Sequence, residues 1–231
     1  APLLANDKPY LYISEGKAYF PILFDYPELA DTGFRDEAAR AFVLMPPIPY
    51  TSSEYDLDAI VMPPSARHIL GTDEQGRDLA ARMIHGTRVS ILVGFIAVFI
   101  YVTMGVIIGA LAGYYGGVVD MLVSRFIEII ICFPTFFLIL TILALVGPSL
   151  VNVMLVIGVT GWTGIARIVR GEFLKIREME VVQASRALGG RDRTSIFRHM
   201  LPNAIAPVLG AATLGIAYTI MTELSLSHLG L

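Results

Sequence analysis

The chain has 231 residues, of which 55% are hydrophobic and only 16% are charged, against about 25% charged in an average soluble domain. Its formal net charge of −3 and mean hydropathy of +0.66 exclude a disordered, collagen-like or nucleic-acid-binding chain and disfavour a plain soluble globule. The charge is unevenly spread, because residues 1–88 contain 21 charged side chains and the longer stretch 89–231 contains 16. The first part therefore reads as a soluble acidic segment and the second as a membrane segment.

Residues 1–67 mix short apolar runs with turn residues, and prolines cluster at residues 46–49 and at residues 63–64. Such a pattern is typical of loops that connect short strands. We expect a small, loop-rich external region with a few strands and with a short helix over residues 36–43.

Four windows without any Asp, Glu, Lys, Arg or His follow, at residues 89–112, 129–146, 150–166 and 203–222. A helix needs about 20 residues to cross a bilayer, and a buried helix of a soluble protein rarely stays uncharged on every face for that length. The windows therefore predict an all-α polytopic membrane protein, whose membrane domain covers residues 68–231 and contains four visible spans.

Three local features refine these spans. The spacing Gly105-x-x-x-Gly109, followed by Gly113, lets two membrane helices approach closely, although glycine is also simply frequent in such helices. Pro134 lies one turn inside the second window and predicts a kink or a helix entrance. The single cysteine, Cys132, cannot form an internal disulfide and is expected to be a small buried hydrophobe.

Basic residues concentrate between the third and fourth windows, where residues 167–202 contain eight Lys or Arg side chains and four acidic ones. Loops rich in Lys and Arg remain on the cytoplasmic side of a membrane. We therefore expect this loop and a loop at residues 113–128 to be cytoplasmic, and residues 147–149 and the N-terminal region to be outside. Both visible ends then lie outside, so a further span is expected before Ala1 and another after Leu231.

Apolar and small side chains recur at helical spacing in the basic loop, at Val181, Ala184, Ser185 and Leu188. Gly189 and Gly190 are expected to end this helix. A second short helix is expected over residues 192–200, with Asp192 as its cap and Pro202 opening the next span. Two such helices suit the docking of another protein, whereas an ordinary basic loop held by anionic lipid is an equal alternative on physical grounds.

This stretch resembles the EAA loop of permease subunits of ATP-binding-cassette importers. The pattern of that loop is Glu-Ala-Ala, three residues, Gly, nine residues, Ile, one residue and Leu-Pro. The corresponding positions keep the same spacing and are Gln183-Ala184-Ser185, Gly189, His199 and Leu201-Pro202. Gln183, Ser185 and His199 depart from the pattern, and the uncharged Gln183 allows a hydrogen bond to an ATPase rather than a salt bridge.

Further motifs resemble the C-type subunit of dipeptide and oligopeptide permeases. They are His68-Ile-Leu-Gly-Thr-Asp-Glu-Gln-Gly-Arg-Asp78, Gly113-Tyr-Tyr-Gly-Gly117, Phe133-Pro134, Arg167-x-x-Arg170-Gly171 and Leu226-Ser-His-Leu-Gly-Leu231. Together they cover about residues 68–231, and His228 replaces the phenylalanine that is usual in the last motif.

The resemblance implies an importer permease fold with six spans per subunit, of which four are visible here. It also implies pairing with a second permease subunit, two cytoplasmic ATP-binding subunits and a periplasmic solute-binding protein, in the inner membrane of a bacterial cell. The implied mechanism is alternating access, in which the paired loops follow the closing ATPases and the spans rock outward to receive substrate.

Three groups of residues are candidates for function. The expected ATPase contact comprises Gln183, Ala184, Ser185, Arg186, Leu188 and Gly189. The external loop motif comprises Gly71, Asp73, Gly76, Arg77 and Asp78. Polar span residues that are candidates for the translocation path are Asn152, Thr160, Trp162, Thr163 and Thr219.

The ionisable candidates each have two interpretations. Arg77 between the carboxylates of Asp73 and Asp78 would pin the external loop over the helix ends, and the alternative is contact with the binding protein or with substrate. Glu223 ends one uncharged window and Glu128 precedes another, so each is either a functional group at membrane depth or a hydrated charge at a span end.

We expect no bond chemistry, no cofactor and no metal from this chain. The segment Gly113–Gly117 lacks the Lys-Ser/Thr of a phosphate-binding loop, and the four histidines have no metal-ligand spacing. The expected function is a permease subunit that forms a translocation pathway for peptides and leaves ATP hydrolysis to separate subunits. The alternatives are import of nickel or another small solute within the same family, and a membrane scaffold or channel without an ATPase.

Overall fold

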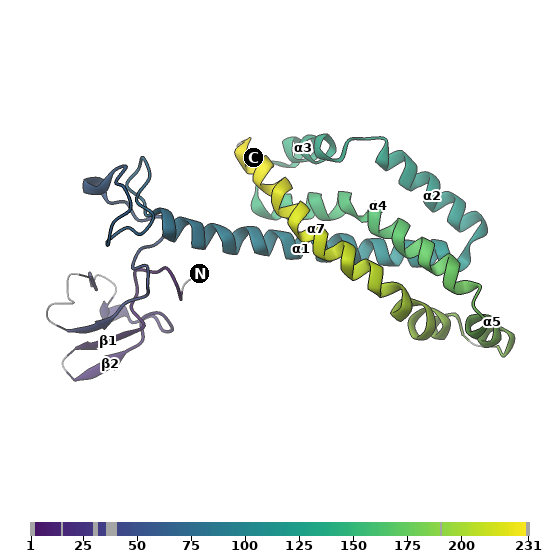
Figure 1. Cartoon of the computed structure of the whole chain (residues 1–231), viewed down its shortest axis with the longest axis horizontal. Helices are drawn as coiled ribbons and strands as arrows, with labels where there is room; N and C mark the ends of the chain where they lie inside the picture. Colours follow the sequence, from purple (N-terminus) through teal and green to yellow (C-terminus); the bar gives the residue numbers. More distant parts are fainter. Residues whose placement is uncertain (1–2, 15, 30–31, 36–40, 190, 230–231) are drawn as a thin grey trace. The chain divides into compact units, whose positions relative to one another are not determined.

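The computed structural model describes residues 3–14, 16–29, 32–35, 41–189 and 191–229. The chain divides into two compact units, Ala1–Val89 and Ser90–Leu231. The first unit consists mostly of loops and short strands, and the second consists of helices (Figure 1). Helix α1 (Leu79–Tyr115) begins in the first unit and continues into the second.

A three-stranded antiparallel sheet forms part of the first unit, and its strand order is β2-β1-β3. The strands are β1 (Leu11–Ser14), β2 (Lys17–Tyr19) and β3 (Phe42–Leu44). Tyr12 of β1 pairs with Tyr19 and Val43 on its two sides, and its buried ring meets the ring of Phe34 edge-on at 5.3 Å. The strands expected from the apolar runs are thus present.

The helix predicted over residues 36–43 is wrong at its C-terminal end. Phe42 and Val43 lie in strand β3, because an aromatic and a β-branched side chain fit a pleated surface and their backbone pairs with β1. Residues 36–40 lie outside the described residues. The described residues of this unit also form the short 3-10 helices η1 (Pro27–Leu29) and η3 (Leu57–Ala59).

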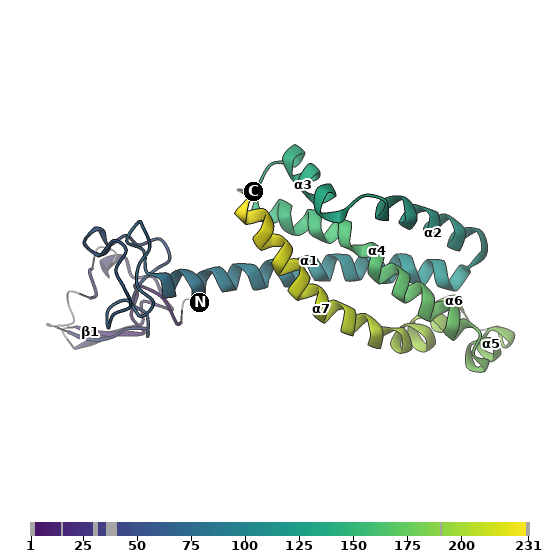
Figure 2. The ribbon, with the colours of Figure 1, turned by 45° about the horizontal axis from the view of Figure 1, so that its top comes forward.

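Five further α-helices, a one-turn helix and a π-helical turn follow α1 in the described part of the second unit (Figure 2). They are α2 (Gly117–Ile131), α3 (Thr135–Val146), α4 (Leu150–Arg177), α5 (Glu180–Ala187), α6 (Asp192–Thr194), the π-helical turn η4 (Ser195–Met200) and α7 (Leu201–His228). Among the described residues, three helical stretches are long and apolar enough to cross a membrane: Leu79–Tyr115, Leu150–Arg177 and Asp192–His228.

The predicted second span is not a straight helix. Helices α2 and α3 are bent by 80° across their break and make up one broken span or a re-entrant segment. Pro134 occupies the N-cap of α3. Because proline has no backbone N–H to donate, helix α2 cannot continue through this position. The kink or entrance predicted at Pro134 is therefore confirmed, whereas the expected loop at residues 113–128 is mostly helix α2. Cys132 in the break is exposed rather than buried as expected.

The small-residue spacing on α1 marks a close contact with α4. A Cβ atom on Gly105 would lie 2.6 Å from Cβ of Ile165, and one on Gly109 would lie 2.5 Å from the carbonyl oxygen of Ala166. Gly113 is equally close to Phe173. The predicted close approach of two helices is confirmed, because no larger side chain fits at these positions without separating α1 from α4.

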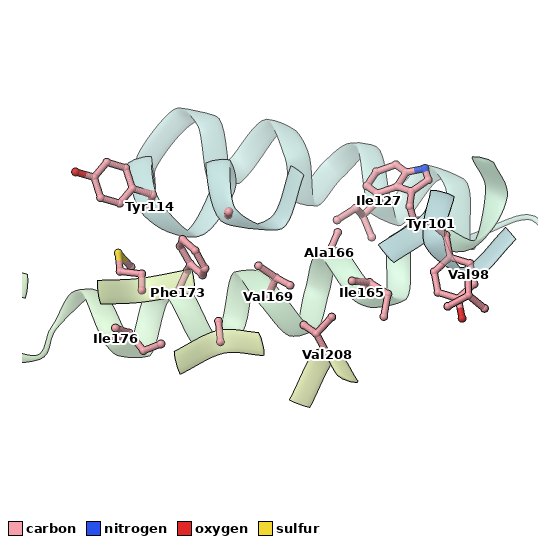
Figure 3. Close-up of a cluster of buried hydrophobic side chains, with 14 of the residues drawn as sticks. Val98, Tyr101, Tyr114, Ile127, Ile165, Ala166, Val169, Phe173, Ile176 and Val208 are labelled. Carbon is pink, nitrogen blue, oxygen red and sulfur yellow. The ribbon is translucent and has the colours of Figure 1, made fainter. Parts of the chain in front are cut away.

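One buried face of α4 organises the core of the second unit, as Figure 3 shows. Val169 and Phe173 are fully buried on that face, and Ile176 continues it toward the end of α4. Met200 and Val208, from η4 and α7, pack into the same cluster. The core therefore joins the long helices to the short elements that precede α7.

Candidate docking surface

Helix α5 is a short surface element between two long helices. Val182 is only 1% exposed and belongs to the same buried cluster as Phe173, Ile176 and Met200. The Gln183 side-chain amide donates to the carbonyl oxygen of Glu178 at 3.2 Å, in the turn that joins α4 to α5. One buried side chain and one hydrogen bond thus fix α5 against the end of α4.

The opposite face of α5 is apolar and open. Val181 is 65% exposed and Leu188 is 88% exposed, with the small Ala184 exposed between them. We call Val181, Ala184 and Leu188 the docking face. Val181 and Ala184 lie on α5 and Leu188 lies in the turn that follows it. A contiguous exposed apolar patch is typical of an interaction site, and the small Ala184 allows a groove on a partner to close over the helix.

The predicted contact residues can be compared with this face. Gln183, Ala184, Leu188 and Gly189 are exposed, so the structure leaves them accessible to a partner. Ser185 and Arg186 lie in α5, and their side chains lie outside the described residues. Their part in the contact stays a prediction.

Gly189 follows α5 with a φ of +75°, the left-handed conformation that ends many helices. A Cβ atom at this position would meet no atom within 4 Å, so the backbone conformation, rather than space, calls for glycine here. The predicted end of the helix is confirmed at Gly189, and Gly190 lies outside the described residues.

The predicted role of Asp192 as a helix cap is wrong. The N-cap of α6 is Arg191, and Asp192 lies in the first turn without a capping hydrogen bond. Its carboxylate instead accepts a hydrogen bond from the hydroxyl of Tyr114 at 2.6 Å, and Tyr114 lies 4% exposed near the end of α1. A buried phenol needs a partner, and this bond ties α6 to α1. The expected helix at residues 192–200 runs without a break into α7.

In the first unit, the external loop motif is organised around Asp73. Its carboxylate accepts hydrogen bonds from the amides of Gln75 and Arg77 at 2.9 and 3.0 Å, and from Nε of Arg77 at 2.9 Å. The Arg82 guanidinium also donates to it. The left-handed glycines Gly71 and Gly76 are required here, because a Cβ on either would overlap a backbone carbonyl of residues 56–64.

Arg77 does not lie between two carboxylates as predicted. Its ion pair in the described part of the chain is with Asp73, whereas Asp78 accepts a hydrogen bond from the Ala81 amide at 2.7 Å and so caps the start of α1. Asp78 also contacts Nδ1 of His68 at 2.9 Å, and both side chains are almost completely buried. Sequence reasoning missed this pair because the two residues belong to a loop and a helix cap that meet only in the fold.

The hydrogen bonds at Asp73 predict that the stability of this loop depends on pH. Burial by itself raises the pKa of Asp73, but the Arg77 and Gln75 amides and the Arg77 guanidinium outweigh it and hold that pKa well below its usual range. An unfolded Asp titrates near pH 3.9, so this stabilisation is complete above about pH 4 and is lost as the pH falls toward the folded pKa. We expect hydrogen exchange to show constant protection of the Gln75 and Arg77 amides from pH 7 to 5 and reduced protection below about pH 4.

The control for this experiment is Asp73→Asn, which removes the titrating group. Protection in this variant should be lower throughout and should not change with pH. Protection that falls with pH equally in both proteins would contradict the assignment to Asp73.

Two of the predicted path residues meet in a cavity of about 220 Å³ in the helical unit. Thr160 and Thr219 line it together with Tyr101 and Tyr218. Sequence reasoning missed the two tyrosines because nothing distinguishes them within uncharged windows. Of the other three predicted residues, Trp162 stacks on Phe126, the Asn152 side chain donates to the Gly147 carbonyl, and Thr163 is not part of the lining.

No group of three or more His, Cys, Asp or Glu side chains that could hold a metal is present in the described part of the chain. The expectation that the chain needs no metal or cofactor stays a prediction.

Comparisons with known proteins agree on one family. Residues 105–231 match the family described as the inner membrane component of binding-protein-dependent transport systems. The chain is 36% identical over 244 residues to the inner membrane ABC transporter permease protein YejE of Escherichia coli, covering 99% of this chain and 72% of that protein. It is 41% identical over 168 residues to the dipeptide transport system permease protein DppC of Alkalihalophilus pseudofirmus, covering 73% of this chain and 55% of that protein.

The fold has a counterpart among solved structures. A chain of the MetNI methionine ABC transporter matches with a TM-score of 0.54 and 22% identity, covering 61% of this chain and 71% of that chain. Long apolar helices with a short exposed helix between two of them thus define a multi-pass helical membrane protein, whose fold resembles that of a chain of an ABC transporter. The chain belongs to the family of binding-protein-dependent transport system inner membrane components and is a permease subunit of an ABC importer.

Proposed function

We propose that the chain forms part of the pathway by which peptides cross a bacterial inner membrane, and that separate cytoplasmic ATPases drive it through α5. The docking face carries the proposal, because Val181 on α5 is 65% exposed and Leu188, in the turn after α5, is 88% exposed, whereas Val182 fixes the helix in the core. The names of the relatives support peptides as the substrate class, since DppC is a dipeptide transport system permease protein.

The proposed assembly contains a second permease subunit, two ATP-binding subunits and a periplasmic solute-binding protein. The docking face would lie in the cytoplasm, because basic residues concentrate around it. ATP-driven closure of the ATPases would then move α5, and the core contacts of Val182 would pass that motion to α4. The hydrogen bond from Tyr114 to Asp192 supplies a second link, which joins α6, the element after α5, to α1.

Labelling of a single cysteine tests both the orientation and the contact. In a Cys132→Ser background, Leu188→Cys should react with a membrane-impermeant maleimide in inside-out vesicles and not in right-side-out vesicles. Addition of the ATP-binding subunits should protect it. Labelling only from the outside would refute the orientation, and full reactivity in the assembled complex would refute the docking role.

A cysteine on the outer side serves as the matched control. Ser149 precedes α4 at the end opposite to α5, so Ser149→Cys should show the reverse pattern of labelling, with no protection by ATPases. This control also shows that the two vesicle preparations have opposite orientations.

A further inference from the structure

A second cavity, of about 230 Å³, lies where α7 ends and α4 begins. Figures 1 and 2 show the C-terminal end of α7 beside α3 and the start of α4 from two directions. The cavity is lined by Pro148, Ser149, Leu150, Val153, Glu223 and Ser227. Glu223 is the one charged residue in this lining, and we call the space the Glu223 cavity.

The carboxylate of Glu223 is held in place, but its charge is not balanced. Ser90 of α1 donates a hydrogen bond to Oε2 of Glu223 at 3.3 Å, so a second helix positions the side chain. Within the described part of the chain, no Lys, Arg or His forms an ion pair with this carboxylate. An ionised group within a membrane helix is costly to desolvate and is normally paired or functional. A cation from outside the chain would complete the site.

The remainder of the lining favours an organic ammonium over a metal ion. Divalent metals take several oxygen ligands and commonly more than one carboxylate, whereas this cavity is lined by one acidic residue and two serines. Ser149 already accepts a hydrogen bond from the Asn152 amide at 3.1 Å, which reduces its value as a metal ligand. Leu150 and Val153 form an apolar wall that suits carbon atoms next to an ammonium group.

We propose that the Glu223 cavity binds a primary ammonium group of the transported peptide, with Glu223 as its counter-ion. An ammonium group has three donors, and its hydrogen bond to a carboxylate is charge-assisted and therefore strong. The cavity is smaller than the roughly 300–1,000 Å³ of sites for drug-sized ligands, so it takes one end of a peptide. The inference rests on the proposed function, which brings peptides to this part of the permease.

Equilibrium binding to the purified full-length importer complex, without its solute-binding protein and without ATP, tests the proposal. The labelled probes are alanyl-alanine, N-acetyl-alanyl-alanine and N-acetyl-lysyl-alanine. The wild type should bind alanyl-alanine about tenfold more tightly than its acetylated form. Tight binding of the lysyl peptide would support an ammonium site that also accepts side chains, and weak binding would support a site restricted to the amino terminus.

Glu223→Gln keeps the shape of the side chain and removes its charge, so it should abolish the preference for the free amino group. Glu128→Gln is the matched control, because Glu128 is an exposed carboxylate that pairs with Arg125 away from the cavity. It should leave the preference unchanged. Should Glu223→Gln prevent assembly, Ser227→Leu narrows the cavity from an exposed position and should weaken binding of alanyl-alanine.

Three outcomes would overturn the proposal. The first is equal binding of the free and acetylated peptides by the wild type, and the second is a preference for the free amino group that survives Glu223→Gln. The third is that sodium or magnesium displaces alanyl-alanine as effectively as ethylammonium does at the same concentration, which would assign the cavity to an inorganic cation. Competition by ethylammonium needs no transport, so a Glu223-dependent effect would persist even if ATP-driven peptide uptake failed.

Discussion

Replacement of Ala184 with tryptophan should separate the permease from its ATP-binding subunits while the permease itself stays folded. Ala184 lies in the middle of the docking face, between Val181 and Leu188, and its side chain is exposed. A large ring there would prevent a groove from closing over α5. The residue that anchors the helix, Val182, points to the other side and is not altered.

We expect co-purification of the ATPases to fall about tenfold or more, because residues at the centre of an interface typically contribute most of its binding energy. Substrate-stimulated ATP hydrolysis should fall with it. Ala184→Ser, which adds only a hydroxyl, is the matched control and should retain both activities. ATPases that still bind and hydrolyse ATP normally in the tryptophan variant would remove α5 from the contact.

Replacement of Gly109 with valine should disrupt the helical unit itself. A Cβ atom there would lie 2.5 Å from the Ala166 carbonyl oxygen and 2.9 Å from Cβ of Val169. Both contacts belong to α4, so α1 and α4 must separate and the buried cluster that includes Val169 must open. Overpacking a dense core lowers the free energy of unfolding by about 1–3 kcal/mol. We expect a loss at the upper end of this range, because the new side chain would meet rigid backbone.

The single tryptophan reports this change, because Trp162 is 3% exposed on α4, near the same contact. We expect a red shift of its emission and a lower yield of monodisperse protein. Gly210→Val is the matched control, since a Cβ on Gly210 of α7 meets no atom within 4 Å. If both variants are equally stable, the close packing of α1 on α4 is not a determinant of the fold.

The parts of the fold that sequence reasoning could predict are those fixed by local chemistry. Uncharged windows indicate α1, α4 and α7, because lipid tolerates few charges on any face of a helix. Gly105 and Gly109 indicate the helix contact, and Pro134 indicates the break. Around α5, the spacing of Ala184 and Leu188 predicts one face, and the structure leaves both residues exposed, with Leu188 in the turn just after the helix.

The parts that sequence reasoning missed depend on partners distant in the chain. Asp192 bonds to Tyr114, 78 residues away, so a local capping rule gives the wrong partner. Both Arg77 and His68 are basic residues near Asp78 in the sequence. In the fold, the buried His68 contacts Asp78, and Arg77 does not pair with it. Helix α2 carries an acidic residue in its first turn and other charges later, so a search for uncharged windows passes over most of it.

The Glu223 cavity shows the same division. Reading the sequence singles out Glu223 as a charge at the end of an uncharged window. Only the fold brings Ser90 from α1 and Ser149 from the start of α4 to the same place. The interpretation of Glu223 as a binding group therefore depends on the residues that surround its carboxylate in the fold and not on its position in the sequence.

The most direct test of the central claim is ATP-dependent uptake of labelled alanyl-alanine by the full importer complex reconstituted in liposomes. The complex should contain this protein, its second permease subunit, the ATPases and the solute-binding protein. The wild type should accumulate the peptide only with ATP, and Ala184→Trp should abolish accumulation. Uptake that does not depend on ATP, or that is unchanged by Ala184→Trp, would contradict a permease driven through α5.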